Sequence, residues 1–373
     1  MIRSPVVASR EAALWQPRAR RAALVALLLL VAACTPAADS GIHVAILAPP
    51  GPSAEASGQA RFIANEFIAD DGARLPLRKW LPRGPVAAVI LALHGFGDYS
   101  HGFERPARIW AAHGIATFAY DQRGFGAAPG HGRWAGEARL AVDAAMASRI
   151  LRLVYPGRPL YLVGESMGGA VAILAASGAL HGVTHRPSEM PAADADGLIL
   201  SAPAVWGRET MDLLPKLLLF AGVRLFPEMI VTGRGLHIRA SDNLPMLRAL
   251  ARDPLVWKGA RINAIYGLVD LMDDAVAAAP RLDTPTLLQY GGHDQVVPRR
   301  AIADLVAHLP PDPGARRRLA YYPRGYHLLL RDLDGTAVAE DVASWIRDRA
   351  LPLPSGADAA ATAKPWPPSR GDG

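Results

Sequence analysis

The chain has 373 residues, of which 51% are hydrophobic, enough to bury the core of one large domain. Its net charge is +6, but residues 1–33 contain five arginines and one glutamate, so the rest of the chain carries only +2. Because basic residues are not clustered or interleaved with aromatics outside that leader, the composition argues against a nucleic-acid-binding protein.

Residues 1–34 have the layout of a bacterial export signal. An arginine-bearing segment precedes the apolar run Ala22–Ala33, which is too short for a bilayer span of about 20 residues. The run ends in the letters VAAC, which resemble the lipobox of bacterial lipoproteins, and Cys34 is the only cysteine in the chain. The resemblance implies that Cys34 becomes the lipidated first residue of the mature protein. Because Thr35 rather than aspartate follows it, we expect the periplasmic side of the outer membrane.

The next segments predict a tether and the start of a sheet. Residues 34–60 are rich in alanine, proline, glycine and serine, which is typical of a tether. Arg61–Ile68 and Arg74–Trp80 are predicted as the two strands of a hairpin, separated by an Asp-Asp-Gly turn. The continuous apolar run Val86–Leu93 favours a strand that is buried on both faces. Together they predict a mixed sheet with an antiparallel beginning.

Beyond residue 100, helix-like and strand-like segments alternate. Helices are expected over Phe103–His113 and Trp134–Val154. The expected strands are Ile115–Tyr120, Leu160–Val163, Gly197–Leu200, Thr286–Gly291 and Arg317–Tyr322. This alternation predicts a parallel sheet with helices on both faces, whose reactive groups collect at the carboxyl ends of the strands.

The segment Leu160–Ser177 combines a buried strand, the pattern GESMG and a helix of small residues. A serine on such a strand-to-helix turn is held in a strained backbone conformation that exposes its hydroxyl. We therefore predict Ser166 as a nucleophile. The short GxSxG pattern also fits a turn that merely packs a helix against a sheet, so the assignment depends on partner residues.

A glycine-rich loop, HGFGD, follows the strand that ends at Leu93. The backbone N–H of Phe96 is expected to form an oxyanion hole with that of Met167, the residue after Ser166. An ordinary glycine-rich turn is the alternative. Asp121 follows the next strand and is interpreted as part of a structural loop, because in this architecture the acid comes after the nucleophile.

An acid and a base are predicted at the ends of the last two strands. Asp294 follows the strand Thr286–Gly291 and is the predicted acid. Its rivals fall in helix or linker patterns and are Asp270, Asp273, Asp274 and Asp283. His327 is the predicted base, because among the 11 histidines it alone follows both the nucleophile and the acid at the end of a strand. No cluster of histidine, cysteine or carboxylate has metal-ligand spacing, so no metal and no cofactor are expected.

The alternation fails between residues 204 and 260, where leucines and phenylalanines are interrupted by proline and glycine. We expect a cap of short helices, which would suit an acyl-chain substrate; simple packing on the main domain is the alternative. Val338–Ala350 is predicted as the closing helix. The predicted parts are a signal peptide (1–33), a tether (34–60), the first part of the core (61–203), a helical cap (204–260), the second part of the core (261–350) and a disordered tail (351–373).

Four motifs in the order HGFGD, GESMGG, YGGHDQVVP and RGYH resemble those of the monoacylglycerol lipase and lysophospholipase family of α/β-hydrolases. The resemblance covers about Ile68–Ile346 and implies the α/β-hydrolase fold, a mostly parallel sheet with an inserted helical cap. Family members often have histidine where Glu165 stands. By residue, the resemblance implies nucleophile Ser166, acid Asp294, base His327, and oxyanion donors Phe96 and Met167.

The expected function is that of a serine esterase. It would cleave carboxylic esters of single-chain lipids, such as monoacylglycerols or lysophospholipids, through an acyl-enzyme, while anchored to an envelope membrane. An aminopeptidase or a thioesterase on the same fold is an alternative. A different class, an inactive hydrolase fold that serves as a lipoprotein scaffold, is disfavoured because all three triad positions are filled.

Overall fold

The computed structural model describes residues 60–180, 188–233, 235, 238–312, 314, 316–361 and 366–367. The predicted signal peptide, Cys34 and the predicted tether up to residue 59 lie outside the described residues. All the elements below belong to the predicted hydrolase domain.

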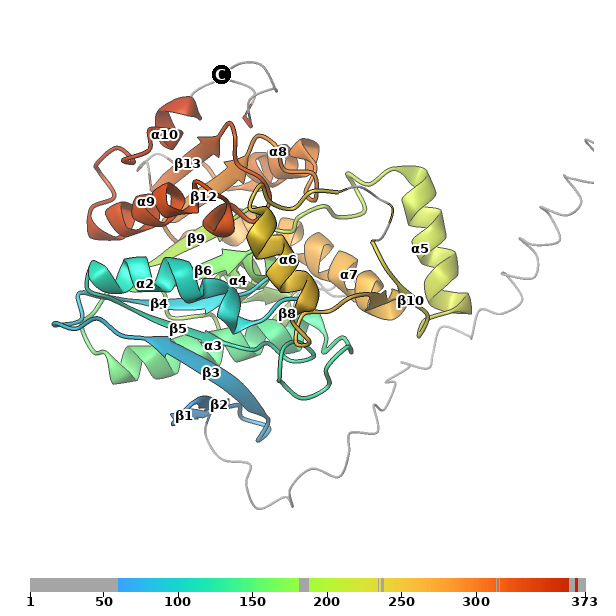
Figure 1. Cartoon of the computed structure of the whole chain (residues 1–373), viewed down its shortest axis with the longest axis horizontal. Helices are drawn as coiled ribbons and strands as arrows, with labels where there is room; N and C mark the ends of the chain where they lie inside the picture. The colour runs from blue at the N-terminus through green and yellow to red at the C-terminus, as the bar shows by residue number, and fades with distance from the viewer. Residues whose placement is uncertain are drawn as a thin grey trace, which may run out of the picture. The chain divides into compact units, whose positions relative to one another are not determined.

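A nine-stranded sheet forms the centre of this domain (Figure 1). In spatial order its strands are β1 (Arg61–Ile63), β2 (Glu66–Ile68), β3 (Arg74–Trp80), β5 (Ile115–Tyr120), β4 (Ala88–Leu93), β6 (Leu160–Glu165), β9 (Gly197–Ser201), β12 (Thr286–Gly291) and β13 (Arg317–Tyr322). The pairings from β1 to β5 are antiparallel, and all those from β5 to β13 are parallel. The predicted mixed, mostly parallel sheet is confirmed.

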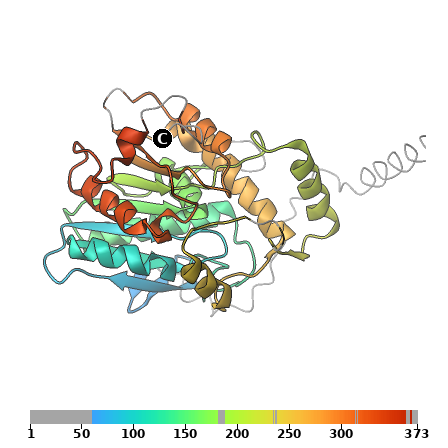
Figure 2. The same ribbon diagram turned by 45° about the horizontal axis from the view of Figure 1, so that its top comes forward.

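Helices cover both faces of the sheet (Figures 1 and 2). One face carries α3 (Glu137–Val154), α4 (Met167–Ser177), α7 (Ile262–Ala278) and α8 (Arg299–His308), and the other carries α2 (Glu104–Ala112) and α9 (Gly335–Arg347). Side chains alternate along β4, because successive residues of a strand point to opposite faces. Leu91 and Leu93 pack with the α3–α4 side, whereas Ile90 and Ala92 pack with the α2–α9 side.

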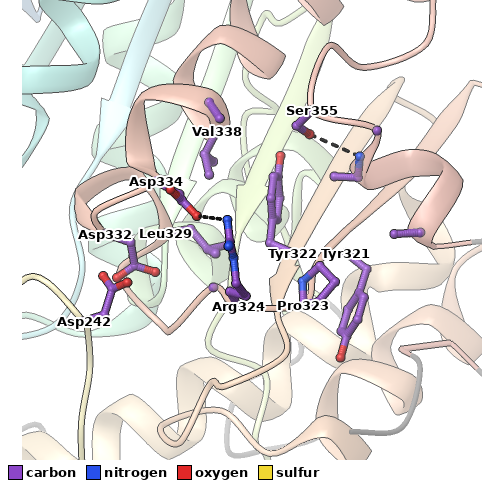
Figure 3. Close-up of a pocket in the computed structure, with 15 residues that line it drawn as sticks. Asp242, Tyr321, Tyr322, Pro323, Arg324, Leu329, Asp332, Asp334, Val338 and Ser355 are labelled. Carbon is purple, nitrogen blue, oxygen red and sulfur yellow. Dashed lines mark hydrogen bonds and ion pairs between the residues drawn. The ribbon is translucent and has the colours of Figure 1, made fainter. Parts of the chain in front are cut away.

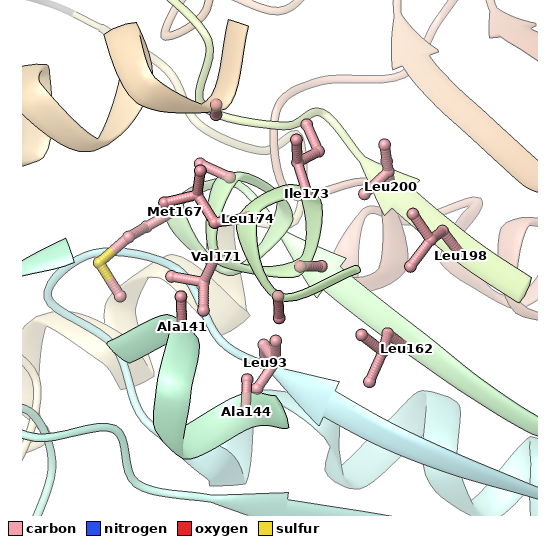
Figure 4. Close-up of a cluster of buried hydrophobic side chains, with 14 of the residues drawn as sticks. Leu93, Ala141, Ala144, Leu162, Met167, Val171, Ile173, Leu174, Leu198 and Leu200 are labelled. Atoms are coloured by element: carbon pink, nitrogen blue, oxygen red, sulfur yellow. The ribbon is translucent and has the colours of Figure 1, made fainter. Parts of the chain in front are cut away.

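The helix that begins just after Ser166 is buried on all sides. Figure 4 shows Leu93, Leu162 and Leu198 of three neighbouring strands around α4. Small residues such as Ala170 and Ala172 let the helix approach the sheet, while Ile173 and Leu174 fill the remaining space. Burying a side chain of that size contributes about 1.5–3 kcal/mol, so this core fixes the position of the helix and of the serine before it.

Between β9 and α7 the chain leaves the sheet and forms the region predicted as a cap. Its elements are α5 (Leu213–Leu225), β10 (Ile230–Val231), α6 (Leu244–Arg252) and β11 (Ala260–Arg261). Asn243 begins α6, and its side-chain oxygen accepts a hydrogen bond from Met246 N at 3.2 Å, which satisfies a donor of the first turn. β10 and β11 pair antiparallel and close the insertion before α7.

Short elements complete the described chain. They are η2 (Ser100–Phe103), β7 (Ala179–Leu180), β8 (Ser188–Glu189), η3 (Ala279–Arg281), η4 (Leu329–Arg331) and α10 (Ala357–Ala360). No helix within the described ranges is both long enough and apolar enough to cross a bilayer.

The first predicted strand, Arg61–Ile68, is two strands in the structure. β1 and β2 form a tight antiparallel hairpin in which Ile63 pairs with Glu66, so Ala64 and Asn65 make the turn. Ala64 adopts a positive φ of 44°, and asparagine is a common turn former. The turn was missed because the segment has apolar residues on both sides of Asn65 and no glycine or proline that would mark a turn.

The structure also corrects the prediction of a disordered tail for residues 351–361, 366 and 367, the part of the tail that it describes. Leu353, Ala357 and Trp366 are buried, and α10 packs on β13. Arg318 forms an ion pair with Asp358 of α10. The segment lacks helical periodicity in its sequence, but a few separated apolar side chains and one ion pair are enough to order it against the core.

Candidate active site

Ser166 lies on a sharp turn between β6 and α4. Its φ of 53° and ψ of −117° are unfavourable for a residue with a Cβ, and such a conformation costs about 1–3 kcal/mol. The glycines on either side allow the turn. A Cβ at Gly164 would lie 2.3 Å from the carbonyl oxygen of Gly168, and one at Gly168 would lie 1.9 Å from that of Leu93. The strained turn holds the serine hydroxyl above the ends of the parallel strands.

The structure brings Ser166 together with the two residues predicted as base and acid. His327 follows β13, and its Nε2 lies 2.9 Å from Ser166 Oγ. Asp294 follows β12, and its Oδ2 lies 2.8 Å from His327 Nδ1. The other carboxylate oxygen of Asp294 accepts hydrogen bonds from Val296 N at 2.7 Å and Val297 N at 3.0 Å. The chain of hydrogen bonds therefore runs from a fixed carboxylate through the imidazole to the serine hydroxyl.

The histidine of this chain is buried and carries a shifted pKa. Burial opposes the charged imidazolium of His327, but the nearby carboxylates, Asp294 foremost, together outweigh burial, and the pKa of His327 is raised above its usual value. Glu165 also raises this pKa, whereas Arg331 lowers it. A neutral imidazole in this position can take the proton of Ser166 while Asp294 holds its tautomer.

The loop that carries Phe96 lies directly against the serine. A Cβ added to Gly95 would be 3.3 Å from Ser166 Cβ. Met167 is the first residue of α4, where the backbone N–H has no carbonyl four residues earlier within the helix. The N–H groups of Phe96 and Met167 thus belong to two segments that meet at Ser166, which is the arrangement that the predicted oxyanion hole needs.

Two residues outside the Phe96 loop, Gln122 and Trp257, hold it in place through hydrogen bonds. Burial lowers the pKa of His94, and its neutral Nε2 accepts a hydrogen bond from Gln122 N at 2.9 Å. The Gln122 side chain in turn donates to His94 O at 2.9 Å. From the cap region, Trp257 N donates to Gly97 O at 2.8 Å. The loop is therefore fixed from both the sheet and the cap, and the sequence patterns did not point to these partners.

A cavity of about 640 Å³ opens beside Ser166 and His327. Its walls are mainly apolar and come from the cap region, α7 and the loop after Asp294. The apolar lining residues are Phe96, Ala204, Trp206, Met211, Ile238, Ala240, Leu250, Val256, Trp257, Ile265, Leu268, Val269, Met272, Val296, Val297, Pro298 and Leu328. A cavity of this composition favours a hydrocarbon group next to the reacting serine.

The cap region also contacts the histidine loop. Leu328 N donates to Ala240 O at 2.9 Å, and Ser241 Oγ donates to Asp332 Oδ1 at 2.6 Å. The second carboxylate oxygen of Asp332 accepts from Tyr326 N at 2.7 Å, and burial raises the pKa of Asp332 to about 6. Asp332 thus joins the cap to the loop on which His327 sits.

The carboxylates considered as rivals of Asp294 have other partners. Asp270 and Asp273 form ion pairs with Arg208, and Asp283 forms one with Arg316. Asp121 accepts hydrogen bonds from Ser100 N and Ala127 N, in agreement with a structural loop. Within the described ranges, no group of three or more histidine, cysteine or carboxylate side chains could hold a metal ion.

Three charged residues at the site were not predicted to act together. Arg331 forms ion pairs with both Asp98 and Glu165, and all three side chains are buried beside the catalytic residues. The sequence holds one signal for Arg331: it comes four residues after His327, which places it near the site. Nothing in the sequence pattern shows which carboxylates it contacts.

Comparison with known proteins shows the family of this chain. The sequence profile of the Hydrolase_4 family, described as serine aminopeptidase S33, matches residues 84–334, about two thirds of the chain. The chain belongs to this family. Proteins similar to this chain include the human monoglyceride lipase, which is 28% identical over 294 residues covering 76% of this chain and 90% of that protein. The monoacylglycerol lipase of Mycolicibacterium smegmatis is 27% identical over 298 residues, covering 76% and 96%.

Solved structures show the same fold. A soluble variant of monoglyceride lipase from Saccharomyces cerevisiae, in complex with a substrate analogue, matches with a TM-score of 0.60 at 20% identity, covering 81% of this chain and 99% of that one. The monoacylglycerol lipase of Paleococcus ferrophilus matches with a TM-score of 0.56 at 20% identity, covering 73% and 98%. The predicted α/β-hydrolase fold is confirmed.

Proposed function

We propose that this protein is a serine hydrolase that cleaves carboxylic esters of single-chain lipids, of the monoacylglycerol or lysophospholipid type. The observation that carries the proposal is the hydrogen-bonded series Asp294–His327–Ser166 at the wall of an apolar cavity. The similarity to two monoacylglycerol lipases, each covered over at least nine tenths of its length, supports the same reaction.

The geometry supports a two-step reaction. His327 Nε2 takes the proton of Ser166 Oγ as that oxygen attacks the ester carbonyl carbon, and the oxyanion forms between the N–H groups of Phe96 and Met167. His327 then gives the proton to the leaving alcohol, and the acyl group stays on Ser166. Water enters, loses a proton to His327 and attacks the acyl carbon; the bond from that carbon to Ser166 Oγ then breaks, His327 returns the proton to Oγ, and the fatty acid is released. Asp294 stabilises the imidazolium in both steps.

The charges that line the cavity favour esters over aminopeptidase substrates. An aminopeptidase needs a carboxylate that is free to receive the substrate's ammonium group. The two carboxylates among the lining residues are Asp98 and Glu165, and both are already paired with Arg331. The remaining walls are mainly apolar, which suits an acyl chain better than the polar backbone of a peptide.

A substrate panel on the purified protein tests the proposal. We expect hydrolysis of p-nitrophenyl butyrate, monoacylglycerols and lysophospholipids, with little activity on aminoacyl p-nitroanilides. Faster turnover of an acyl thioester than of the matched ester would favour the thioesterase. Absence of both turnover and labelling by a fluorophosphonate probe would favour the inactive scaffold.

The acid limb of the pH profile of kcat/KM should have its midpoint above the ordinary pKa of histidine. Protonated His327 cannot act as a base, so kcat/KM falls as the pH drops through its raised pKa. Asp294 and Glu165 favour the imidazolium and Arg331 opposes it. We expect a midpoint above about 6.5 for a neutral p-nitrophenyl ester, measured as kcat/KM from pH 5 to 9. A midpoint well below 6 would contradict this.

We further propose that Cys34 is lipidated and that the domain works at an envelope membrane. Helix α5 supports a lipid surface as the source of substrate. Leu213, Leu214 and Leu218 are each more than 60% exposed, and Met211, just before the helix, lines the cavity. Exposed apolar side chains gathered on one helix mark an interaction surface, and lipid would cover this one beside the site.

Replacing Cys34 by alanine should move the protein from the membrane to the soluble fraction. The cysteine is the only residue that can carry the acyl chains of a lipoprotein anchor, and stable anchoring needs more than one chain. Fractionation of the expressing cells and mass spectrometry of the N-terminal peptide measure the change. Unaltered membrane association, with an unmodified Cys34 in the wild-type protein, would reject the anchor.

A further inference from the structure

Arg331 lies in a buried cluster of charged side chains next to the catalytic residues. Its Nη1 is 2.6 Å from Asp98 Oδ2, and its Nη2 is 2.5 Å from Glu165 Oε1. The side chain of Arg331 is 7% exposed, and those of Asp98 and Glu165 are also nearly closed to solvent. A guanidinium group is well suited to this position, because its planar fork can donate to two carboxylates at once.

Each member of the cluster belongs to a different segment of the site. Asp98 is two residues after Phe96 in the oxyanion loop, and Glu165 is the residue before Ser166. Arg331 is in η4, four residues after His327, and its carbonyl accepts from Asn243 Nδ2 of the cap region at 2.9 Å. One side chain therefore joins the segment that binds the oxyanion, the segment of the nucleophile and the segment of the base.

The cluster also determines which charges act on the imidazole of His327. Asp294 and Ser166 contact His327 directly, and Glu165 and Arg331 act on it through space. The carboxylate of Glu165 raises the pKa of His327, and the guanidinium of Arg331 lowers it. Removing Arg331 alone would leave the buried carboxylates of Asp98 and Glu165 both without their partner, whereas neutralising Glu165 as well would leave only Asp98 unpaired, which is less costly.

We propose that Arg331 is a positioning residue for ester hydrolysis, which through Asp98 and Glu165 holds the oxyanion loop and the nucleophile in register with His327. The inference rests on the proposed function, since it concerns the same site. Arg331 does not touch the reacting atoms. Its effect is on where the oxyanion donors lie and on the charge that His327 experiences.

The test compares Arg331→Met, Arg331→Lys, Glu165→Gln and the double variant Arg331→Met/Glu165→Gln. The matched control is Arg324→Met, on the same loop. Arg324 is 83% exposed and pairs with Asp334 at the edge of a separate cavity of about 550 Å³ (Figure 3). For each variant, thermal unfolding, the fraction labelled by a fluorophosphonate probe, kcat, and the pH profile of kcat/KM on p-nitrophenyl butyrate are measured.

We expect kcat of Arg331→Met to fall about 10- to 100-fold, because a misplacement of about 1 Å in the site can have that effect. Its acid limb should move to higher pH, and that of Glu165→Gln to lower pH. Arg331→Lys keeps the charge but cannot bridge both carboxylates, so its kcat should fall while its acid limb stays near the wild-type position. The double variant should be less impaired than the product of the single effects, and Arg324→Met should match the wild type.

Wild-type kcat and an unmoved acid limb in Arg331→Met and Glu165→Gln would overturn the proposal. If Arg331→Met does not fold, Arg331→Lys and Glu165→Gln decide, and wild-type behaviour of both overturns it. A loss of labelled protein in proportion to activity, with wild-type pH profiles, would indicate a purely structural role and also overturn it. Should the wild type hydrolyse no ester, the proposed function fails separately, and the rate of probe labelling of Ser166 still compares the variants.

Discussion

Replacing Ser166 by alanine is expected to lower kcat for ester hydrolysis by about 10⁵- to 10⁶-fold. The hydroxyl is the group that forms the acyl-enzyme, and it carries the proton that His327 Nε2, 2.9 Å away, takes as a base. The variant should fold, because alanine removes one oxygen from a half-buried site and makes no new contact. The measurements are turnover of p-nitrophenyl butyrate and labelling by a fluorophosphonate probe, both of which should disappear.

Ser177→Ala is the matched control for this prediction. Ser177 ends the helix that begins after Ser166, and its hydroxyl donates to Leu174 O at 3.1 Å and accepts from Ala179 N at 3.2 Å. Turnover and labelling should stay at the wild-type level in the control. Residual activity of more than about 1% in Ser166→Ala, where a loss of 10⁵-fold or more is expected, would show that another group is the nucleophile.

Replacing Asp294 by asparagine is expected to lower kcat by about 10⁴-fold without changing the shape of the site. Oδ2 of Asp294 accepts a hydrogen bond from His327 Nδ1–H at 2.8 Å, which keeps the proton on Nδ1 and leaves Nε2 free to act as a base. An amide N–H at that position would favour the other tautomer, whose Nε2 carries the proton and cannot take one from Ser166. Turnover of the same ester at pH 7 to 8 checks the effect, and thermal unfolding checks the fold.

The loss of charge gives this variant a second signature. Without the Asp294 carboxylate the pKa of His327 should fall, so the acid limb of the residual activity should move to lower pH. Asp283→Asn is the control, because that carboxylate lies on the surface and pairs with Arg316. An Asp294→Asn variant that retains more than a tenth of the wild-type turnover would mean that another carboxylate orients the histidine.

The elements near Ser166 could be predicted because their causes are local. A buried parallel strand reads as an apolar run such as LYLV, and a glycine on each side of a serine permits the strained turn that follows it. The residues singled out at the ends of β4, β6, β12 and β13 lie together because parallel strands end on the same edge of the sheet. The two features that were missed are local as well. They are the turn at Asn65 and the part of the tail that is anchored by Leu353 and Trp366, whose sequence has no helix or strand periodicity.

The partners of the charged residues could not be predicted. Arg331 pairs with carboxylates 233 and 166 positions earlier in the chain, and no pattern of spacing selects them from the 34 acidic residues. The same holds for the hydrogen bond from Trp257 N in the cap to Gly97 O in the oxyanion loop. A long-range contact depends on where the sheet and the cap place two backbones, and that information is spread over the whole chain.

By itself, then, the amino-acid sequence determined the fold class and the chemical type of the site, because strand and helix periodicity, tight glycine turns and residue chemistry are properties of short segments. Only the tertiary structure decided how the three segments of the site are held together, through Arg331 between Asp98 and Glu165, and how the cap region closes over the serine. Those features arise from burial, because a buried charge is stable only beside an opposite charge and apolar surface is stabilised by packing against other apolar surface. Which residues are buried together is set by the packing of the whole domain.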